Sequence, residues 1–291
     1  MKLKITNLSK TYKNGVKALD RLNLEIGSGM FGLLGPNGAG KSSLMRTIAT
    51  LQKPDSGTVE FDGIDVLNDN MALRKNLGYL PQEFGVYPNM SATDLLDYMA
   101  RLKGVASKKD RKEIITKVLE VTNLYEQRNK SVSGYSGGMK QRFGIAQLLL
   151  NNPKLIIVDE PTAGLDPAER HRFLNVLREI GTSHTVIFST HIVDDVKDLC
   201  NEMAILNGGK ILAQGRPAEA EAKLEGQIWV KVIDRESLEA YERDFNVISS
   251  SYNQDNTLNI KVYSLERPDE TFINAKPQLE DVYFVALKND R

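Results

Sequence analysis

The stretch Gly35-Pro36-Asn37-Gly38-Ala39-Gly40-Lys41-Ser42 decides the fold. It matches the pattern G-x-x-x-x-G-K-[ST] and lies between an apolar run, 30–34, and a stretch of helical character, 43–50. Glycines let backbone N–H groups turn inward around phosphate oxygens, and the helix that follows adds the positive end of its dipole. Lys41 can reach the β- and γ-phosphates, and Ser42 offers Mg²⁺ a hydroxyl. Because both flanks are of the right kind, the stretch predicts a nucleotide-binding loop rather than a glycine turn with a stray lysine.

Two further apolar runs end in polar residues. Residues 155–158 lead into Asp159 and Glu160, and residues 186–188 lead into Ser189, Thr190 and His191. Ligands of open α/β sheets lie beyond the carboxyl ends of parallel strands, so these ends should meet at the phosphate loop. There Asp159 is the candidate ligand of Mg²⁺, and Glu160 can hold a water in line with the γ-phosphate. Without the loop, a solvated strand-end turn would explain both carboxylates equally well.

The order of apolar runs and helical stretches predicts an α/β fold with a mostly parallel sheet covered by helices on both faces. Between residues 83 and 151 the pattern is helical throughout, with start signals at Ser91, Ser107 and Ser136, and it predicts an inserted helical subdomain. After Gly215, residues 228–233 and 258–262 resemble strands and residues 279–287 an amphipathic helix. We therefore expect a small α+β domain over residues 215–291.

Composition excludes several classes of protein. Lys plus Arg and Asp plus Glu both number 38 among 291 residues, so no net basic charge favours nucleic acid. The single Cys200 has no disulfide partner in the chain, and no apolar run approaches the roughly 20 residues that span a bilayer. The first residues lack the continuous apolar stretch of a signal peptide. These features predict a reduced, cytosolic protein without a membrane span of its own.

A second glycine-rich helix start narrows the function. Ser136-Gly137-Gly138-Met139 resembles the signature motif of ABC-type ATPases, whose commonest form is LSGGQ, with Tyr135 and Met139 in place of its Leu and Gln. This variant resembles the drug- and antibiotic-export branch. A capping Ser followed by glycines still offers a hydroxyl, bare N–H groups and a positive dipole to a phosphate. In isolation the same residues would indicate only a capped helix.

The resemblance extends over residues 2–214 and implies roles for four more residues. Tyr12 lies where the family stacks an aromatic ring on adenine, and Gln82 matches the glutamine that reaches Mg²⁺ and the attacking water. Asp166 matches the loop that crosses between subunits, although it is also a good N-cap for a helix after Pro167. His191 matches the histidine that contacts the γ-phosphate. Taken alone, each of these residues would more readily be assigned a structural role.

The resemblance also implies an architecture and a set of ligands. It places an ABC-type nucleotide-binding domain at residues 1–214, with an antiparallel β-subdomain at its N-terminus. ATP and Mg²⁺ are the implied cofactors. The ATP would lie on residues 35–42 and Ser43, with Ser136, Gly137, Gly138 and Met139 supplied by the opposite subunit.

The leading functional expectation is an ATPase subunit that drives a separate transmembrane permease, in the manner of an exporter, from the cytoplasmic face of the cell membrane. Its partners would be that permease and a second ATPase subunit, either another copy of this chain or a homologue, with no nucleic acid involved. The permease would dock a short helix near residues 82–98. Two other classes are disfavoured: soluble ABC ATPases of DNA repair, chromosome organisation or translation carry long heptads, zinc cysteines or duplicated ATPase units, and phosphate-loop kinases lack the Ser136-Gly137-Gly138 element.

Overall fold

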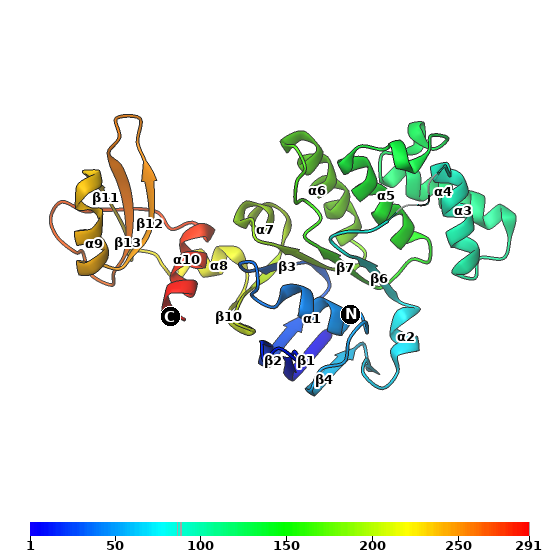
Figure 1. Cartoon of the computed structure of the whole chain (residues 1–291), viewed down its shortest axis with the longest axis horizontal. Coiled ribbons are helices and arrows are strands. Elements are labelled where there is room, and N and C mark those ends of the chain that lie inside the picture. Colours follow the sequence, from blue (N-terminus) through cyan, green and yellow to red (C-terminus); the bar gives the residue numbers. More distant parts are fainter. Residues whose placement is uncertain (86, 88, 291) are drawn as a thin grey trace.

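The computed structural model describes residues 1–85, 87 and 89–290, so Val86 and Pro88 of the expected docking segment lie outside the described residues. The largest sheet has the strand order β10-β9-β3-β8-β7-β6 (Figure 1). These strands are Lys210–Gly215, Glu202–Asn207, Gly29–Leu34, Thr185–Thr190, Leu155–Asp159 and Leu77–Leu80. All neighbours pair in parallel except β10, which pairs antiparallel with β9. The mostly parallel sheet is thus confirmed, and its three predicted strands are β3, β8 and β7, side by side in the sheet.

Both faces of this sheet are covered, which explains its apolar strands. Alternate residues of β7 enter different hydrophobic clusters: Leu155 and Ile157 face helix α1 (Lys41–Ile48), whereas Ile156 and Val158 face α5 (Gly137–Leu149) and α6 (Pro167–Gly181). On the α1 side lies an antiparallel sheet of order β2-β1-β4-β5, the expected N-terminal β-subdomain. Its strands are Lys17–Ile26, Leu3–Thr11, Ser56–Phe61 and Ile64–Asp65. Helix α2, Asn70–Arg74, leads from this sheet into β6.

Three helices follow β6 and form the expected helical region: α3 (Ala92–Leu102), α4 (Lys108–Val121) and α5. Each begins at a predicted serine, since Ser91, Ser107 and Ser136 accept hydrogen bonds from backbone N–H groups of the first turn. The helices enclose a hydrophobic cluster of their own that includes buried side chains from all three. Across the part of the chain that the structure describes, no helix combines the length and the apolar character that crossing a bilayer requires.

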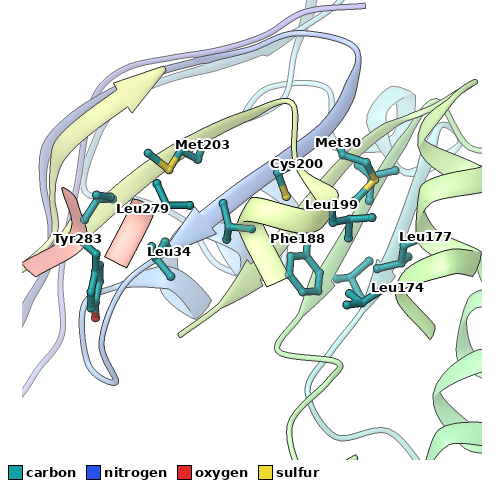
Figure 2. Close-up of a cluster of buried hydrophobic side chains, with 14 of the residues drawn as sticks. Met30, Leu34, Leu174, Leu177, Phe188, Leu199, Cys200, Met203, Leu279 and Tyr283 are labelled. Atoms are coloured by element: carbon teal, nitrogen blue, oxygen red, sulfur yellow. The ribbon is translucent and has the colours of Figure 1, made fainter. Parts of the chain in front are cut away.

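The C-terminal segment forms a third sheet, antiparallel and of order β12-β13-β11-β14 (Figure 1). Its strands are Val247–Tyr252, Leu258–Tyr263, Ile228–Ile233 and Ile273–Asn274, and helix α9, Leu238–Asp244, covers one face. Helices α8 (Pro217–Ala222) and α10 (Leu279–Asn289) lie between this sheet and the six-stranded one (Figure 1). Leu279 and Tyr283 of α10 belong to the same cluster as Leu34 and Met203 (Figure 2). One apolar core therefore joins the C-terminal segment to α7 (Val193–Leu199) and the six-stranded sheet.

Candidate nucleotide site

The phosphate loop joins β3 to α1 and is pressed against neighbouring backbone. A Cβ added to Gly35 would come within 2.3 Å of the Leu206 carbonyl oxygen, and one added to Gly40 within 2.3 Å of the Ala18 carbonyl oxygen. Gly38 and Gly40 have φ angles of 82° and 111°, which side chains rarely adopt. Helix α1 has Gly40 as its N-cap, with no side chain accepting from its first N–H groups and no acidic residue in its first turn. These N–H groups and the helix dipole therefore remain available to an anion.

Lys41 lies inside the loop rather than in solvent. Its side chain is 4% exposed, and its ammonium group donates to the carbonyl oxygens of Gly35 and Pro36 at 2.7 and 3.1 Å. It also forms an ion pair with Glu160, with 3.0 Å between Nζ and Oε1. The cation is thus held within reach of both the loop and the carboxylate at the end of β7.

Asp159 ends β7 beneath the loop and is 2% exposed. Burial raises the pKa of its carboxyl group, while hydrogen bonds donated by Ser189 and Ser42 act in the opposite direction. The bond from Ser189 Oγ measures 2.8 Å. The buried Asp159 carboxylate and the Ser42 hydroxyl beside it are hard oxygen ligands of the kind that Mg²⁺ prefers.

Glu160 is held by its neighbours in an uncommon backbone conformation. Its φ of 45° lies in the left-handed region, and its N–H donates to both the carbonyl oxygen and the hydroxyl of Ser189 at 3.2 and 3.0 Å. One carboxylate oxygen meets Lys41 and the other lies 3.3 Å from Nδ1 of His191, which is half exposed. The ends of β7 and β8 therefore bring Glu160 and His191 together at the phosphate loop, where the sequence places them.

A cavity of about 440 Å³ opens above the loop, within the size range of small-ligand pockets. Its lining includes Gln82, Glu160 and much of the loop: Asn37, Gly38, Ala39, Gly40, Lys41, Ser42 and Ser43. Tyr12 closes one side, with its hydroxyl 2.9 Å from Ser43 Oγ and 3.1 Å from Gln52 Oε1. A hollow of about 510 Å³ between α4 and α6 contains none of the predicted site residues. Most of the residues predicted for one ATP half-site thus line a single cavity, while Asp159 and His191 lie outside its lining.

The signature residues lie elsewhere. Ser136 is the N-cap of α5 and its hydroxyl accepts from the Met139 N–H at 3.2 Å. Gly137 follows it, and a Cβ on Gly138 would come within 2.2 Å of Glu169 Oε2. None of these residues lines the cavity at the phosphate loop. Asp166 is exposed and caps α6 by accepting from the Glu169 N–H at 2.9 Å, so its expected capping role is present.

Sequence reasoning assigned no role to several polar residues around the site. They are Gln52, Arg142, Glu169, Arg170, Ser189 and Asp195. A local signal existed for two of them: Asp195 is four residues before Leu199 on the buried face of α7, and Arg142 lies four residues after Gly138 on α5. A charged residue on an apolar helix face requires a partner. The sequence alone does not show which distant residue that partner is.

Comparison with known proteins extends this picture. Residues 19–163 match the family model described as ABC transporter. The chain is 35% identical over 249 residues to YxlF of Bacillus subtilis, an uncharacterized ABC transporter ATP-binding protein, covering 85% of this chain and 82% of YxlF. It is 37% identical over 224 residues to the Nod factor export ATP-binding protein I of Rhizobium etli, covering 76% and 70% of the two chains. The daunorubicin/doxorubicin resistance ATP-binding protein DrrA of Streptomyces peucetius is 33% identical over 228 residues, covering 78% and 68%.

Solved structures are similar to about three quarters of the chain. cbiO1 of Clostridium perfringens, part of the ABC transporter complex cbiONQ, has a TM-score of 0.70 and 29% identity, covering 76% of this chain and 90% of that one. The ATP-binding cassette MJ0796, in a dimeric post-hydrolysis state bound to ADP and phosphate, has a TM-score of 0.66 and 28% identity, covering 74% and 98%.

Proposed function

Because this chain belongs to the ABC transporter family as an ATP-binding, ATP-hydrolysing subunit, we propose that it pairs with a second ATPase subunit and powers a transmembrane exporter. The second subunit is another copy of the chain or a homologue. In such a pair, the phosphate loop of one subunit faces Ser136, Gly137, Gly138 and Met139 of the other across a shared ATP. Export is supported by relatives named for Nod factor export and for daunorubicin/doxorubicin resistance.

One observation carries the proposal: Lys41 and Glu160 line a cavity built on the phosphate loop, with His191 beside Glu160, while the signature residues lie outside it. The cavity is lined by the phosphate loop, including Lys41, and by Glu160, which can orient a water. The second phosphate-binding element of the sequence, Ser136-Gly137-Gly138, lies outside it. In the proposed pair, the second subunit brings its own copy of that element to this cavity. The dimer of MJ0796 supports this arrangement by similarity.

Each half-site residue has a distinct task. The loop N–H groups and Lys41 bind the β- and γ-phosphates, Glu160 accepts hydrogen bonds from the attacking water, and His191 contacts the γ-phosphate. Ser42, Asp159 and Gln82 would hold Mg²⁺, whose charge would neutralise the phosphate oxygens when bound. This oxygen donor set fits a Mg²⁺ ion that takes its other ligands from phosphate and water. Among the described residues no separate group of three or more His, Cys, Asp or Glu side chains is arranged to hold a metal.

ATP binding and hydrolysis drive the closing and reopening of the pair of subunits. ATP stabilises the closed pair because both subunits contact it, and hydrolysis weakens that shared contact, so the pair reopens. We place the subunit at the cytoplasmic face of the membrane, where the permease contacts the surface around Gln82 and Tyr98. The exposed rings of Tyr87 and Tyr98, 6.1 Å apart, give this surface an apolar centre.

A mixing experiment tests the shared site. Ser136→Arg and Lys41→Ala each remove one half of every site in a homodimer, so each variant alone should be inactive. An equimolar mixture should recover part of the wild-type ATPase activity, because mixed dimers contain one intact site. The activity of the wild type per molecule should also fall on dilution to nanomolar concentration, where dimers dissociate. Dilution-independent activity of a monomer would refute the shared site.

A further inference from the structure

The first turn of α6 carries two adjacent opposite charges, and each meets a buried partner on a different element. Glu169 Oε2 lies 3.2 Å from a guanidinium nitrogen of Arg142 on α5, whose side chain is 7% exposed. Arg170 Nε lies 2.6 Å from Oδ1 of Asp195 on α7, which is 0% exposed. One turn of helix thus holds two other helices at once.

The Glu169 contact fixes the start of the signature helix. The side chain of Glu169 occupies the space that a Cβ of Gly138 would need, with its Oε2 at 2.2 Å and its own Cβ at 2.8 Å from that position. Arg142 in turn donates to the carbonyl oxygen of Asn123 at 3.3 Å. Moving Glu169 would therefore move the backbone of the motif itself, because Gly138 has no side chain to yield.

The Arg170 contact fixes the opposite side of the turn. The second oxygen of Asp195 accepts from Thr162 Oγ1 at 2.9 Å and lies 3.5 Å from Thr190 Oγ1. Thr162 comes two residues after Glu160, and Thr190 directly precedes His191. Asp195 thus joins α6 to the loop that follows β7 and Glu160, and to the end of β8 next to His191.

Buried ion pairs contribute little net stability, because removing two charges from water costs about as much as their attraction returns. Apolar side chains would pack these helices at least as well. What the ion pairs add is a fixed geometry between three elements, since charge-assisted hydrogen bonds restrict both distance and direction.

We propose that Glu169 and Arg170 are positioning residues that link the His191 loop of a subunit to its signature helix. This inference rests on the proposed function. In a pair of subunits, His191 serves the ATP held by its own phosphate loop, whereas Ser136, Gly137 and Gly138 serve the ATP held by the other. The turn therefore transmits a displacement at one ATP site to the placement of donors at the second site.

A first experiment measures ATP-dependent dimer formation by sizing in a Glu160→Gln background, which blocks turnover. Adding Glu169→Gln, which keeps the shape of the side chain, should raise the protein concentration at half-dimerisation about tenfold, the effect of one lost charge-assisted hydrogen bond. The ATP affinity of the monomer should stay as in the parent. The melting temperature should fall, because buried Arg142 loses its charged partner, so dimerisation is measured well below the melting temperature of the variant. Arg172→Gln is the matched control, because exposed Arg172 also contacts Glu169, at 2.6 Å, but on the solvent side. Unchanged dimerisation, or an equal effect of Arg172→Gln, would overturn the role of Glu169.

A second experiment isolates the link between the sites. In the mixture described above, the Lys41→Ala subunit contributes its signature motif and its Asp166 loop, but no working phosphate loop, to the one intact site. Arg170→Gln added to this subunit should lower turnover severalfold, since its effect can reach the intact site only through α6 and the elements that α6 holds. Full turnover would overturn the link, and Arg172→Gln again serves as the control.

The outcomes separate the two proposals. If the Glu160→Gln parent stays monomeric with ATP, the shared-site function and this inference fail together. If the parent dimerises and Glu169→Gln dimerises equally well, only the inference fails. The parent mixture could prove inactive although the wild type dimerises. In that case the role of Arg170 is tested by the first experiment, with Arg170→Gln in place of Glu169→Gln. The same rise in the concentration at half-dimerisation is then expected.

Discussion

The start of α1 and the start of α5 are two glycine-rich helix ends that differ in the groups they offer to a phosphate. Neither has an acidic residue in its first turn, whereas α3 and α6 have Asp94 and Glu169 there. At α1 no side chain caps the helix, and the buried cation Lys41 adds its charge to the free N–H groups. At α5 the hydroxyl of Ser136 already accepts from one N–H group.

The difference indicates a division of labour. The α1 end, with its cation and two carboxylates in reach, is equipped to bind a phosphate chain and to act on it. The α5 end offers N–H groups and a hydroxyl, with no cation among its first three residues, Gly137, Gly138 and Met139, so it is suited to complete a site whose ligand is already held. ATP should therefore bind first at α1, and the substitutions below test how the two helix ends differ.

The largest effect is expected from Glu160→Gln. The amide keeps the shape of the side chain but loses the charge that orients the water, so turnover should fall about 10²–10⁴-fold. ATP binding should persist, because the α1 end retains its N–H groups and Lys41. Steady-state hydrolysis and calorimetric titration with ATP measure the two quantities. Turnover within twofold of the wild type would remove Glu160 from the catalytic role.

Lys41→Ala should instead weaken binding itself. The cation contacts phosphate in the ground state as well as in the transition state, and a charge-assisted hydrogen bond contributes about 1.5–3 kcal/mol. Calorimetry should show ATP affinity falling by one to two orders of magnitude by that estimate. Lys53→Ala, an exposed lysine outside the cavity lining, is the control. Equal loss in both variants would show that general charge, rather than the loop, attracts ATP.

Sequence reasoning placed the glycine-rich loop between a strand and a helix, and Asp159 and Glu160 at a strand end, because both depend on local pattern. Contiguous residues set the loop conformation, and the strand that precedes them sets its place at the sheet edge. The helix starts at Ser91, Ser107 and Ser136 were predictable for the same reason.

What the sequence did not reveal depends on distant contacts. The ion pair of Lys41 with Glu160 joins residues more than a hundred positions apart, and the contact of Arg170 with Asp195 depends on how α6 and α7 pack. Strand β12 and helix α9 were not predicted either. The first is a polar edge strand with three consecutive serines, and the second is a short, highly charged helix, so neither has the apolar periodicity on which such predictions depend.

Tyr12 tests whether the α1 end also recognises the base. Tyr12→Ala should reduce affinity for adenine nucleotides by about 1–3 kcal/mol, the contribution of one stacked ring. Tyr12→Phe keeps the ring and loses only the hydrogen bonds to Ser43 and Gln52, so its loss should be smaller. Titration of both variants with ATP separates the two contributions. If Phe binds as weakly as Ala, the hydroxyl rather than the ring is responsible.

The smallest expected effect is a difference in folding stability between substitutions at the two glycines of the signature motif. It is measured on the isolated subunit without nucleotide. A Cβ on Gly138 meets Glu169 at 2.2 Å, whereas one on Gly137 meets only Leu165, at an ordinary 3.7 Å. Gly138→Ala should therefore destabilise the fold by about 1–3 kcal/mol through overpacking. Gly137→Ala should change stability by less than about 1 kcal/mol, because alanine favours a helix over glycine. Chemical denaturation measures both values. Equal stabilities would mean that Glu169 moves aside freely, and that the α5 end is no more tightly held by its surroundings than an ordinary capped helix.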